Sequence, residues 1–291
     1  MRFRRRGLRG EKRGGLARTP RFPLPRWPAI LTGKMFPLLS QSLGPDALRP
    51  ELERLSEKAA RLHAGMPLPP AFAESLEHKL SIELTHGSNA IEGNTLSLRE
   101  TQLLIDEGIT PAGAKSLREI YETLNHHKAL GRLREFVQTA SPIAETALGE
   151  LHTIIMQQID SERGGVYRRD PVFVTGAPIQ PIRAEKIREA MSELVVWLGQ
   201  DSSDLHPVIR TAEAHYRFVK IHPFYDGNGR TGRLLLNWIL LTRRYPLAVI
   251  ESERRSQYLH ALDDADRGKP ELFLRLICEC VERSLDQYLA R

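Results

Sequence analysis

The chain has 291 residues, enough for one large domain or two small ones, and its hydrophobic content of 41% and charged content of 27% are ordinary for a globular protein. No stretch approaches the roughly 18–20 apolar residues of a membrane span, so a membrane partner is not expected. The two cysteines, Cys278 and Cys280, are two positions apart. On a helix they would point to different sides, which disfavours a disulfide or metal site and fits packing in a cytoplasmic protein.

The net charge of +6 is carried by one end of the chain. Residues 1–34 hold 11 Lys and Arg and one acid, Glu11, which leaves 31 basic and 35 acidic residues in the remainder. The segment is rich in Arg, Gly and Pro and has no periodicity, so we expect a disordered basic tail without a secretory signal. A start assigned upstream of the true first residue, Met35, would give the same pattern. A nucleic-acid-binding regulator that uses this tail is the alternative, less favoured because such runs are weak motifs.

Most of the remaining chain has helical periodicity, so the predicted fold class is all-α. Ser97 with Glu100, and Ser116 with Glu119, have the spacing of a capping box, in which a serine and a glutamate bond to each other's backbone at a helix start. The periodicity predicts further helices at 46–63, 70–86, 183–199, 204–221, 230–243, 252–266 and 270–289.

Residues 141–182 give two further signals. Ser141 followed by Pro142 predicts a helix start. The helical pattern then breaks at 164–182, where Val172, Phe173 and Val174 are β-prone and have Gly and Pro on both sides. We predict a short, exposed β-hairpin at 171–182, for which a plain connection between helices is one possible role.

Residues 222–233, HPFYDGNGRTGR, lie between two helix-like runs. Glycines let the backbone approach an anion closely, and amides at a helix start point at it. A phosphate site therefore suits Gly227, Gly229 and Gly232. Asn228 adds a side-chain amide.

Charged side chains of the same segment suit phosphate chemistry. Arg230 and Arg233 lie three apart, on one face of the predicted helix, where two guanidinium groups can bind a phosphate chain. Asp226 is a hard oxygen ligand, suited to a Mg²⁺ ion that bridges phosphates. His222 can accept a proton near neutral pH. Each residue alone is more often structural, but together they predict a catalytic nucleotide site.

Residues 227–232 also fit the pattern G-x-G-x-x-G of dinucleotide-binding proteins. That site requires a buried strand before the first glycine, and here the preceding residues are HPFYD, with a proline that cannot donate to a sheet. Nicotinamide binding is therefore a minor alternative.

The segment matches every fixed position of the Fic motif, H-x-F-x-[DE]-G-N-G-R-x-x-R, and the chain resembles the Fic family over roughly residues 70–290. The resemblance implies an all-helical bundle that transfers AMP from ATP to a Ser, Thr or Tyr hydroxyl of a target protein and of itself. It implies that His222 is the base, that Asp226 holds Mg²⁺, and that Arg230 and Arg233 bind the phosphate chain, with Arg233 towards its γ end.

The same resemblance assigns supporting roles. Asn228 and the glycine amides would line the anion hole, Phe224 would anchor the loop, and Tyr258 would lie near the nucleotide base. The hairpin at 171–182 resembles the family's flap, which pairs with a target segment as an added strand. The implied organisation is a tail (1–34), a helical region with an inhibitory helix (35–96) and the catalytic core (97–291).

Residues 88–93, SNAIEG, match the family's inhibitory pattern [ST]-x-x-x-E-[GN] at Ser88, Glu92 and Gly93. The resemblance implies that Glu92 pairs with Arg233 and prevents productive ATP binding, whereas the alternative is a helix end capped by Gly93. The same groups suit two other reactions, removal of AMP from a target and transfer of another nucleotide. A homodimer is also possible, because inhibition in this family is often coupled to dimer contacts.

Overall fold

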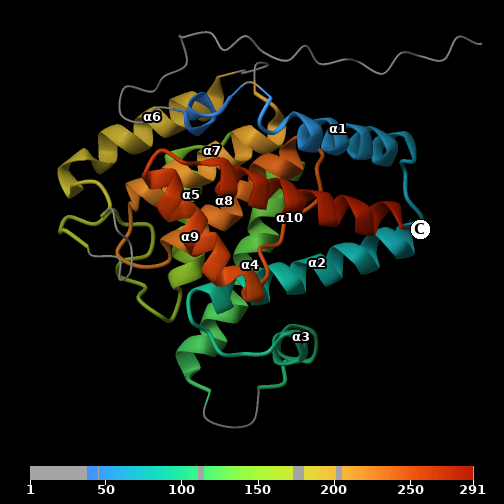
Figure 1. Cartoon of the computed structure of the whole chain (residues 1–291). Coiled ribbons are helices and arrows are strands. Elements are labelled where there is room, and N and C mark those ends of the chain that lie inside the picture. The colour runs from blue at the N-terminus through green and yellow to red at the C-terminus, as the bar shows by residue number, and fades with distance from the viewer. Residues whose placement is uncertain (1–37, 45, 111–114, 173–179, 201–204, 291) are drawn as a thin grey trace, which may run out of the picture.

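The computed structural model describes residues 38–44, 46–110, 115–172, 180–200 and 205–290. These residues form ten α-helices and three short 3-10 helices, and they contain no strand, so the all-α prediction is confirmed for them (Figure 1). The α-helices are α1 (Arg49–Ala64), α2 (Pro70–Ile91), α3 (Leu98–Glu107), α4 (Leu117–Gln138), α5 (Glu145–Met156), α6 (Ile187–Gly199), α7 (Pro207–Ile221), α8 (Asn228–Thr242), α9 (Arg255–Asp266) and α10 (Glu271–Leu289). The 3-10 helices are η1 (Leu39–Ser42), η2 (Ala184–Lys186) and η3 (Ser252–Arg254).

Two expected segments fall largely outside these residues. The basic tail at 1–34 does so entirely. Of the predicted hairpin, Val172 is described and is not in a strand, whereas Phe173 and Val174 are not described. The hairpin therefore stays a prediction.

Both predicted capping boxes are present. The hydroxyl of Ser97 accepts a hydrogen bond from the backbone of Glu100 (3.2 Å), and the Glu100 carboxylate accepts one from the backbone of Ser97 (2.7 Å). Ser116 and Glu119 make the same pair of bonds at 3.2 and 2.9 Å. These bonds satisfy backbone groups that a helix start leaves free, which fixes where α3 and α4 begin.

The predicted helix start at Ser141 was wrong. Helix α5 begins at Glu145, after Ala144. The backbone of Ser141 instead donates to the carbonyl of Phe136 (2.8 Å), and its hydroxyl bonds to Thr139 (2.8 Å). Ser141 thus closes the end of α4, because its backbone and hydroxyl are both engaged there.

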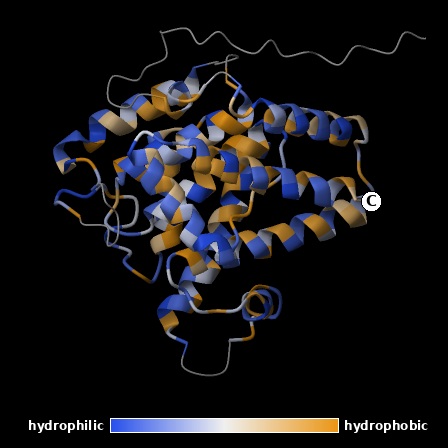
Figure 2. Cartoon of the chain, viewed as in Figure 1, coloured by the Kyte–Doolittle hydropathy of each residue, from blue (hydrophilic) through white to orange (hydrophobic). Residues whose placement is uncertain are grey.

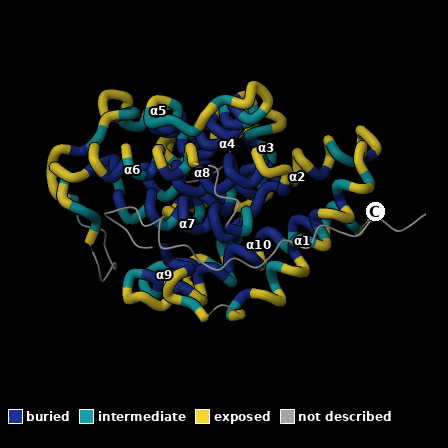
Figure 3. The backbone as a smooth tube through the Cα atoms, turned by 90° about the horizontal axis from the view of Figure 1, so that it is seen from above, coloured by how far each residue is buried: buried dark blue, intermediate teal, exposed yellow. Residues whose placement is uncertain are grey.

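Helix α8 lies between two clusters of buried side chains. Leu235, Leu236 and Ile239 belong to the larger cluster, which also includes side chains of α1, α6, α7, α9 and α10. Leu234 and Trp238 belong to the second, formed with α2, α4 and α5. Every residue of α8 from position 230 to 240 is buried, and Figure 3 shows this helix in dark blue among outer helices with exposed faces. The first turn of α8 is therefore held in place from both sides.

Helix α2 covers the start of α8 and runs five residues further than predicted, to Ile91. Hydrophilic and hydrophobic stretches alternate along α1 and α2 in Figure 2, as expected for helices with one buried face. Gly87 makes a close approach, because a side chain at this position would meet the carbonyl oxygen of Ile250 at 2.6 Å. The packing of α2 brings Ser88 and Glu92 to α8.

Candidate active site

The predicted catalytic residues lie in one sharp turn between α7 and α8. Helix α7 ends at Ile221, and His222 follows with a left-handed backbone (φ 52°, ψ 59°), its N–H bonded to the carbonyl of Phe218 (3.0 Å). Gly227, also left-handed (φ 73°), precedes the first residue of α8. A left-handed histidine is an unusual conformation that the surrounding structure must support.

Three buried side chains hold this turn. Phe224 is fully buried and stacks on His152, with ring centroids 3.6 Å apart. The Asn228 amide bonds to both backbone groups of Phe224, accepting from its N–H (2.9 Å) and donating to its carbonyl (2.8 Å). The anchoring position of Phe224 agrees with the prediction. The Asn228 side chain thus fastens the loop through its carbonyl and one of its two amide hydrogens. Its predicted contact with an anion stays a prediction.

His152 is a functional residue that the sequence reasoning missed. The N–H of Gly165 donates to its Nδ1 (2.8 Å), so its Nε2 carries the proton and bonds to the carbonyl of Asp226 (2.9 Å). Burial lowers the pKa of His152 to about 4, which keeps it neutral at physiological pH. It comes from α5, 70 positions before the motif, and nothing in its local sequence distinguishes it from a core residue.

Arg168 is a second residue that was missed. Its guanidinium donates to the carbonyls of His222 (2.8 Å), Asp170 (3.0 Å) and Ile182, and its backbone N–H donates to the carbonyl of Pro223 (2.9 Å). One buried arginine therefore joins both ends of the segment at 171–182 to the turn that carries His222. The only signal in the sequence was the pair Arg168 and Arg169, which lies in the Gly- and Pro-containing segment 164–182.

His222 is in the state that a general base requires. Burial lowers its pKa to about 4, and the positive charge of Arg168 adds to this effect. The imidazole is therefore neutral at pH 7 and can accept a proton.

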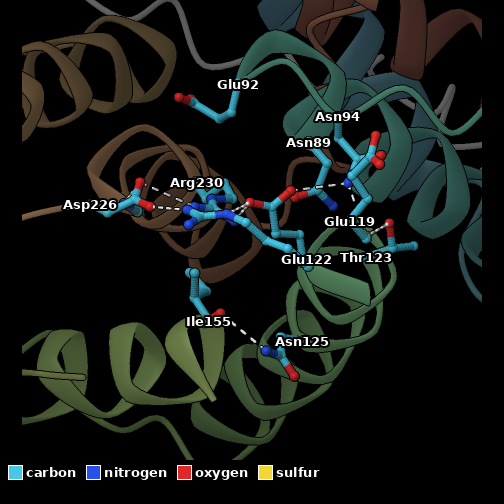
Figure 4. Close-up of polar contacts among 12 residues, drawn as sticks. Asn89, Glu92, Asn94, Glu119, Glu122, Thr123, Asn125, Ile155, Asp226 and Arg230 are labelled. Carbon is cyan, nitrogen blue, oxygen red and sulfur yellow. Dashed lines mark hydrogen bonds and ion pairs between the residues drawn. The ribbon is translucent and has the colours of Figure 1, made fainter. Parts of the chain in front are cut away.

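Asp226 and Arg230 belong to a cluster of two carboxylates and two guanidinium groups, part of which is shown in Figure 4. Arg230, whose side chain is 2% exposed, lies 3.3 Å from both Asp226 and Glu122. Arg118 bonds to the same two acids. Burial alone would raise the pKa of Asp226, but Arg230, the Gly227 N–H and Arg118 together hold it below its ordinary value. Glu122 and Arg118, from α4, were not anticipated.

Arg233 is held by the predicted inhibitory segment. Its guanidinium donates to the hydroxyl of Ser88 (2.9 Å), the carbonyl of Ser88 (2.7 Å) and the carboxylate of Glu92 (2.7 Å). Glu92 lies against the backbone at Gly229, so closely that a side chain there would collide with it. Gly93 follows with a positive φ of 101° and turns the chain out of α2. The predicted ion pair is present, and Gly93 also ends the helix as the alternative supposed.

Tyr258 lies beneath this arginine. Its ring centroid is 6.0 Å from the guanidinium of Arg233, its hydroxyl is 2.8 Å from the Nε2 of His215, and it is 2% exposed. The geometry shows support for Arg233, and the predicted contact with a nucleotide base stays a prediction.

The residues present fit a metal that arrives with a nucleotide. Among the described parts of the chain, no cluster of three or more His, Cys, Asp or Glu side chains could hold a metal by itself. The Asp226 side chain is 45% exposed. Mg²⁺ is commonly bound by one or two carboxylates together with substrate phosphates, and a single exposed carboxylate matches that pattern.

Comparison with known proteins identifies the class of this site. The Fic/DOC family profile matches residues 142–240. A solved structure of a Fic-domain signalling protein from Bacteroides thetaiotaomicron is 33% identical, with a TM-score of 0.72 over 81% of this chain and 95% of that one. A fragment of Fic-1 from C. elegans with one Glu-to-Gly substitution is 28% identical, with a TM-score of 0.74 over 83% of this chain and 72% of that one.

The chain belongs to the Fic/DOC family, and its fold is the Fic-type helical bundle. The protein named "Protein adenylyltransferase Fic" of Drosophila melanogaster is 38% identical over 203 residues, which are 69% of this chain and 41% of that protein. The one of Drosophila mojavensis is 36% identical over 239 residues, 82% of this chain and 47% of that protein. The chain thus spans less than half the length of these relatives. No helix in the described ranges is both long and apolar enough to cross a membrane.

Proposed function

We propose that the protein transfers AMP from ATP to a Ser, Thr or Tyr hydroxyl of a target protein, and to its own hydroxyls. The observation that carries this proposal is the turn at 222–229, which joins a neutral histidine, an exposed carboxylate and the start of a helix with two buried arginines. The names of the curated relatives agree with it.

In this reaction the target hydroxyl oxygen bonds to the α-phosphorus of ATP while the bond to the β-phosphate oxygen breaks. His222 takes the hydroxyl proton, and pyrophosphate leaves. Arg230 and Arg233 stabilise the phosphate charge, and the amides at the start of α8 point towards it. Mg²⁺, when bound through Asp226 and phosphate oxygens, would supply further charge neutralisation.

In this proposal Glu92 inhibits the transfer of AMP. Its carboxylate occupies Arg233 and lies over Gly229, at the helix start where phosphate oxygens would bind. A displacement of the α-phosphate by about 1 Å costs on the order of 10²-fold in rate. ATP that binds beside Glu92 is therefore poorly placed for attack.

Replacement of Glu92 tests the proposal. We expect Glu92→Gly to raise self-labelling by ATP labelled at the α-phosphate by on the order of 10²-fold, because Arg233 becomes free for the nucleotide. Glu107→Gly is a matched control, since Glu107 is an exposed glutamate at the end of α3. An equal rate in wild type and Glu92→Gly would remove the inhibitory role. Absence of labelling in both, with ATP, GTP, CTP and UTP alike, would overturn nucleotidyl transfer.

Glu92 also favours a second candidate, removal of AMP from a modified target. A carboxylate held at the site by an arginine can orient a water molecule for attack on the AMP–protein bond. Incubating an AMP-modified target with the wild-type protein and measuring released AMP would distinguish the two directions.

A cytoplasmic location forms part of the proposal. Cys278 and Cys280 are free thiols in α10, as is usual for proteins of a reducing compartment.

A further inference from the structure

Asp226 presents two oxygens with different surroundings. Its Oδ1 accepts the N–H of Gly227 (2.6 Å) and lies 3.3 Å from Arg230. Its Oδ2 is bonded to the Nη2 of Arg118 at 2.5 Å. Oδ2, the outer oxygen of the carboxylate, is thus the one that a metal ion would bind, and Arg118 already occupies it.

Arg118 differs from the other arginines of the site. Its side chain is 56% exposed, whereas those of Arg230 and Arg233 are 2% exposed. It also lies in the first turn of α4, where the helix dipole disfavours a positive charge. Its position is explained by two acids, since its Nε bonds to Glu122 (3.1 Å) while its Nη2 bonds to Asp226.

We propose that Arg118 takes the place of the divalent cation on Asp226 when no metal is bound, and so sets how strongly nucleotide binding depends on Mg²⁺. This inference rests on the proposed function. A bare carboxylate beside a triphosphate repels it, and either Arg118 or the metal removes that repulsion. Because both bind the outer oxygen, they compete, and the exposed arginine is the weaker partner.

The test compares ATP affinity with and without metal. Calorimetric titration in the Glu92→Gly background gives one dissociation constant in EDTA and one in excess Mg²⁺. We expect Arg118→Gln to raise the ratio of the first to the second about two- to fivefold, the range of an exposed ion pair. Without metal, the Oδ2 oxygen of Asp226 is left without a positive partner and ATP binding weakens. With Mg²⁺, the competitor is gone and ATP binding is unchanged or tighter.

Arg132→Gln is the matched control. It removes the same charge from the same helix, fourteen residues or about 21 Å further along, where Arg132 pairs with Glu135 and Glu150. Arg118→Lys keeps the charge and should give an intermediate ratio. In the Asp226→Asn background, Arg118→Gln should leave the ratio unchanged, because the shared partner is absent.

An unchanged ratio in Arg118→Gln would overturn the inference. Equal weakening of ATP binding in EDTA and in Mg²⁺ is one form of this result. It would show that Arg118 attracts ATP in general and does not compete with the metal. Failure of the proposed function looks different: the Glu92→Gly protein with Arg118 intact would bind no ATP in either condition.

Discussion

Arg230 and Arg233 lie one turn apart on α8, and each is neutralised by a different part of the chain. Arg233 is held from α2 by Ser88 and Glu92, and Arg230 by Asp226 and by Glu122 of α4. A buried guanidinium without a partner is strongly destabilising. The acids thus neutralise the two arginines in the free protein as phosphate oxygens would in the complex, so the contact between Glu92 and Arg233 is expected to stabilise the fold.

His222 is the residue whose loss separates chemistry from binding. We expect His222→Ala, in the Glu92→Gly background, to lower AMP transfer by about 10²–10⁴-fold, because the attacking hydroxyl loses its base. ATP affinity should stay within about twofold, since the arginines remain. Labelled ATP measures the first quantity and calorimetry the second.

His260→Ala is the control for this prediction, because the His260 side chain is 65% exposed, on α9. Persistent labelling in His222→Ala would show that another group, or water, accepts the proton.

Sequence reasoning found the residues of the site that are close together in the chain. The motif at 222–233 could be predicted because its residue types and spacing form a long pattern, whereas the pairing of Glu92 with Arg233 was implied only by the family resemblance. His152, Arg168 and Glu122 could not, since single residues contributed by separate elements leave no local pattern. The loop-holding role of the Asn228 side chain was not anticipated, because an amide suited to an anion is equally suited to nearby backbone groups.

At the scale of elements, α2 both supplies residues to the site and packs closely against the chain near Ile250. It brings Ser88 and Glu92 to α8, and it passes Ile250 with no room for a side chain at Gly87. The packing of this one helix therefore affects both the stability of the protein and the position of the proposed inhibitory residue Glu92.

Gly87→Ala tests that fit. The new methyl group would meet the Ile250 carbonyl, and overpacking of this kind costs about 1–3 kcal/mol of unfolding free energy. We expect the melting temperature to fall by roughly 2–10 °C.

Gly131→Ala provides the comparison within α4. A methyl group there meets nothing within 4 Å, and alanine is the better helix former, so the melting temperature should hold or rise. Equal melting temperatures for the two variants would show that α2 can shift without cost.

The helices themselves were largely predictable, and their ends less so. Capping boxes at Ser97 and Ser116 act within four residues, so the sequence contains the whole signal. The start of α5 depends on how α4 ends, and the last turn of α2 depends on α8. Such boundaries are set by contacts between elements, which periodicity does not report.

At the scale of the whole molecule, buried and partly buried histidines make the stability of the fold depend on pH. Burial lowers the pKa of four of them to about 4: His152, His206, His215 and His222. In the unfolded chain each would titrate near 6.5. Below that pH the unfolded chain binds protons that the folded protein does not, so stability is present above about pH 6.5 and is lost as the pH falls towards 4.

We therefore expect a lower melting temperature at pH 5 than at pH 7.5, with each histidine contributing on the order of 1–2 kcal/mol. His206→Asn isolates one contribution. His206 accepts the N–H of Val208 (3.2 Å) at the start of α7, and asparagine can cap that helix without titrating. Scanning calorimetry should show a smaller drop between the two pH values in this variant. An identical drop would exclude His206 from the effect.

The burial of α8 between two side-chain clusters has a consequence for which substitutions this protein can accept during evolution. From residue 230 to residue 240 the helix has no exposed position, so a side chain of different volume in either cluster disturbs the packing around Arg230 and Arg233. New specificities can therefore arise cheaply only in the segments that approach the helix from outside, while the helix itself stays fixed.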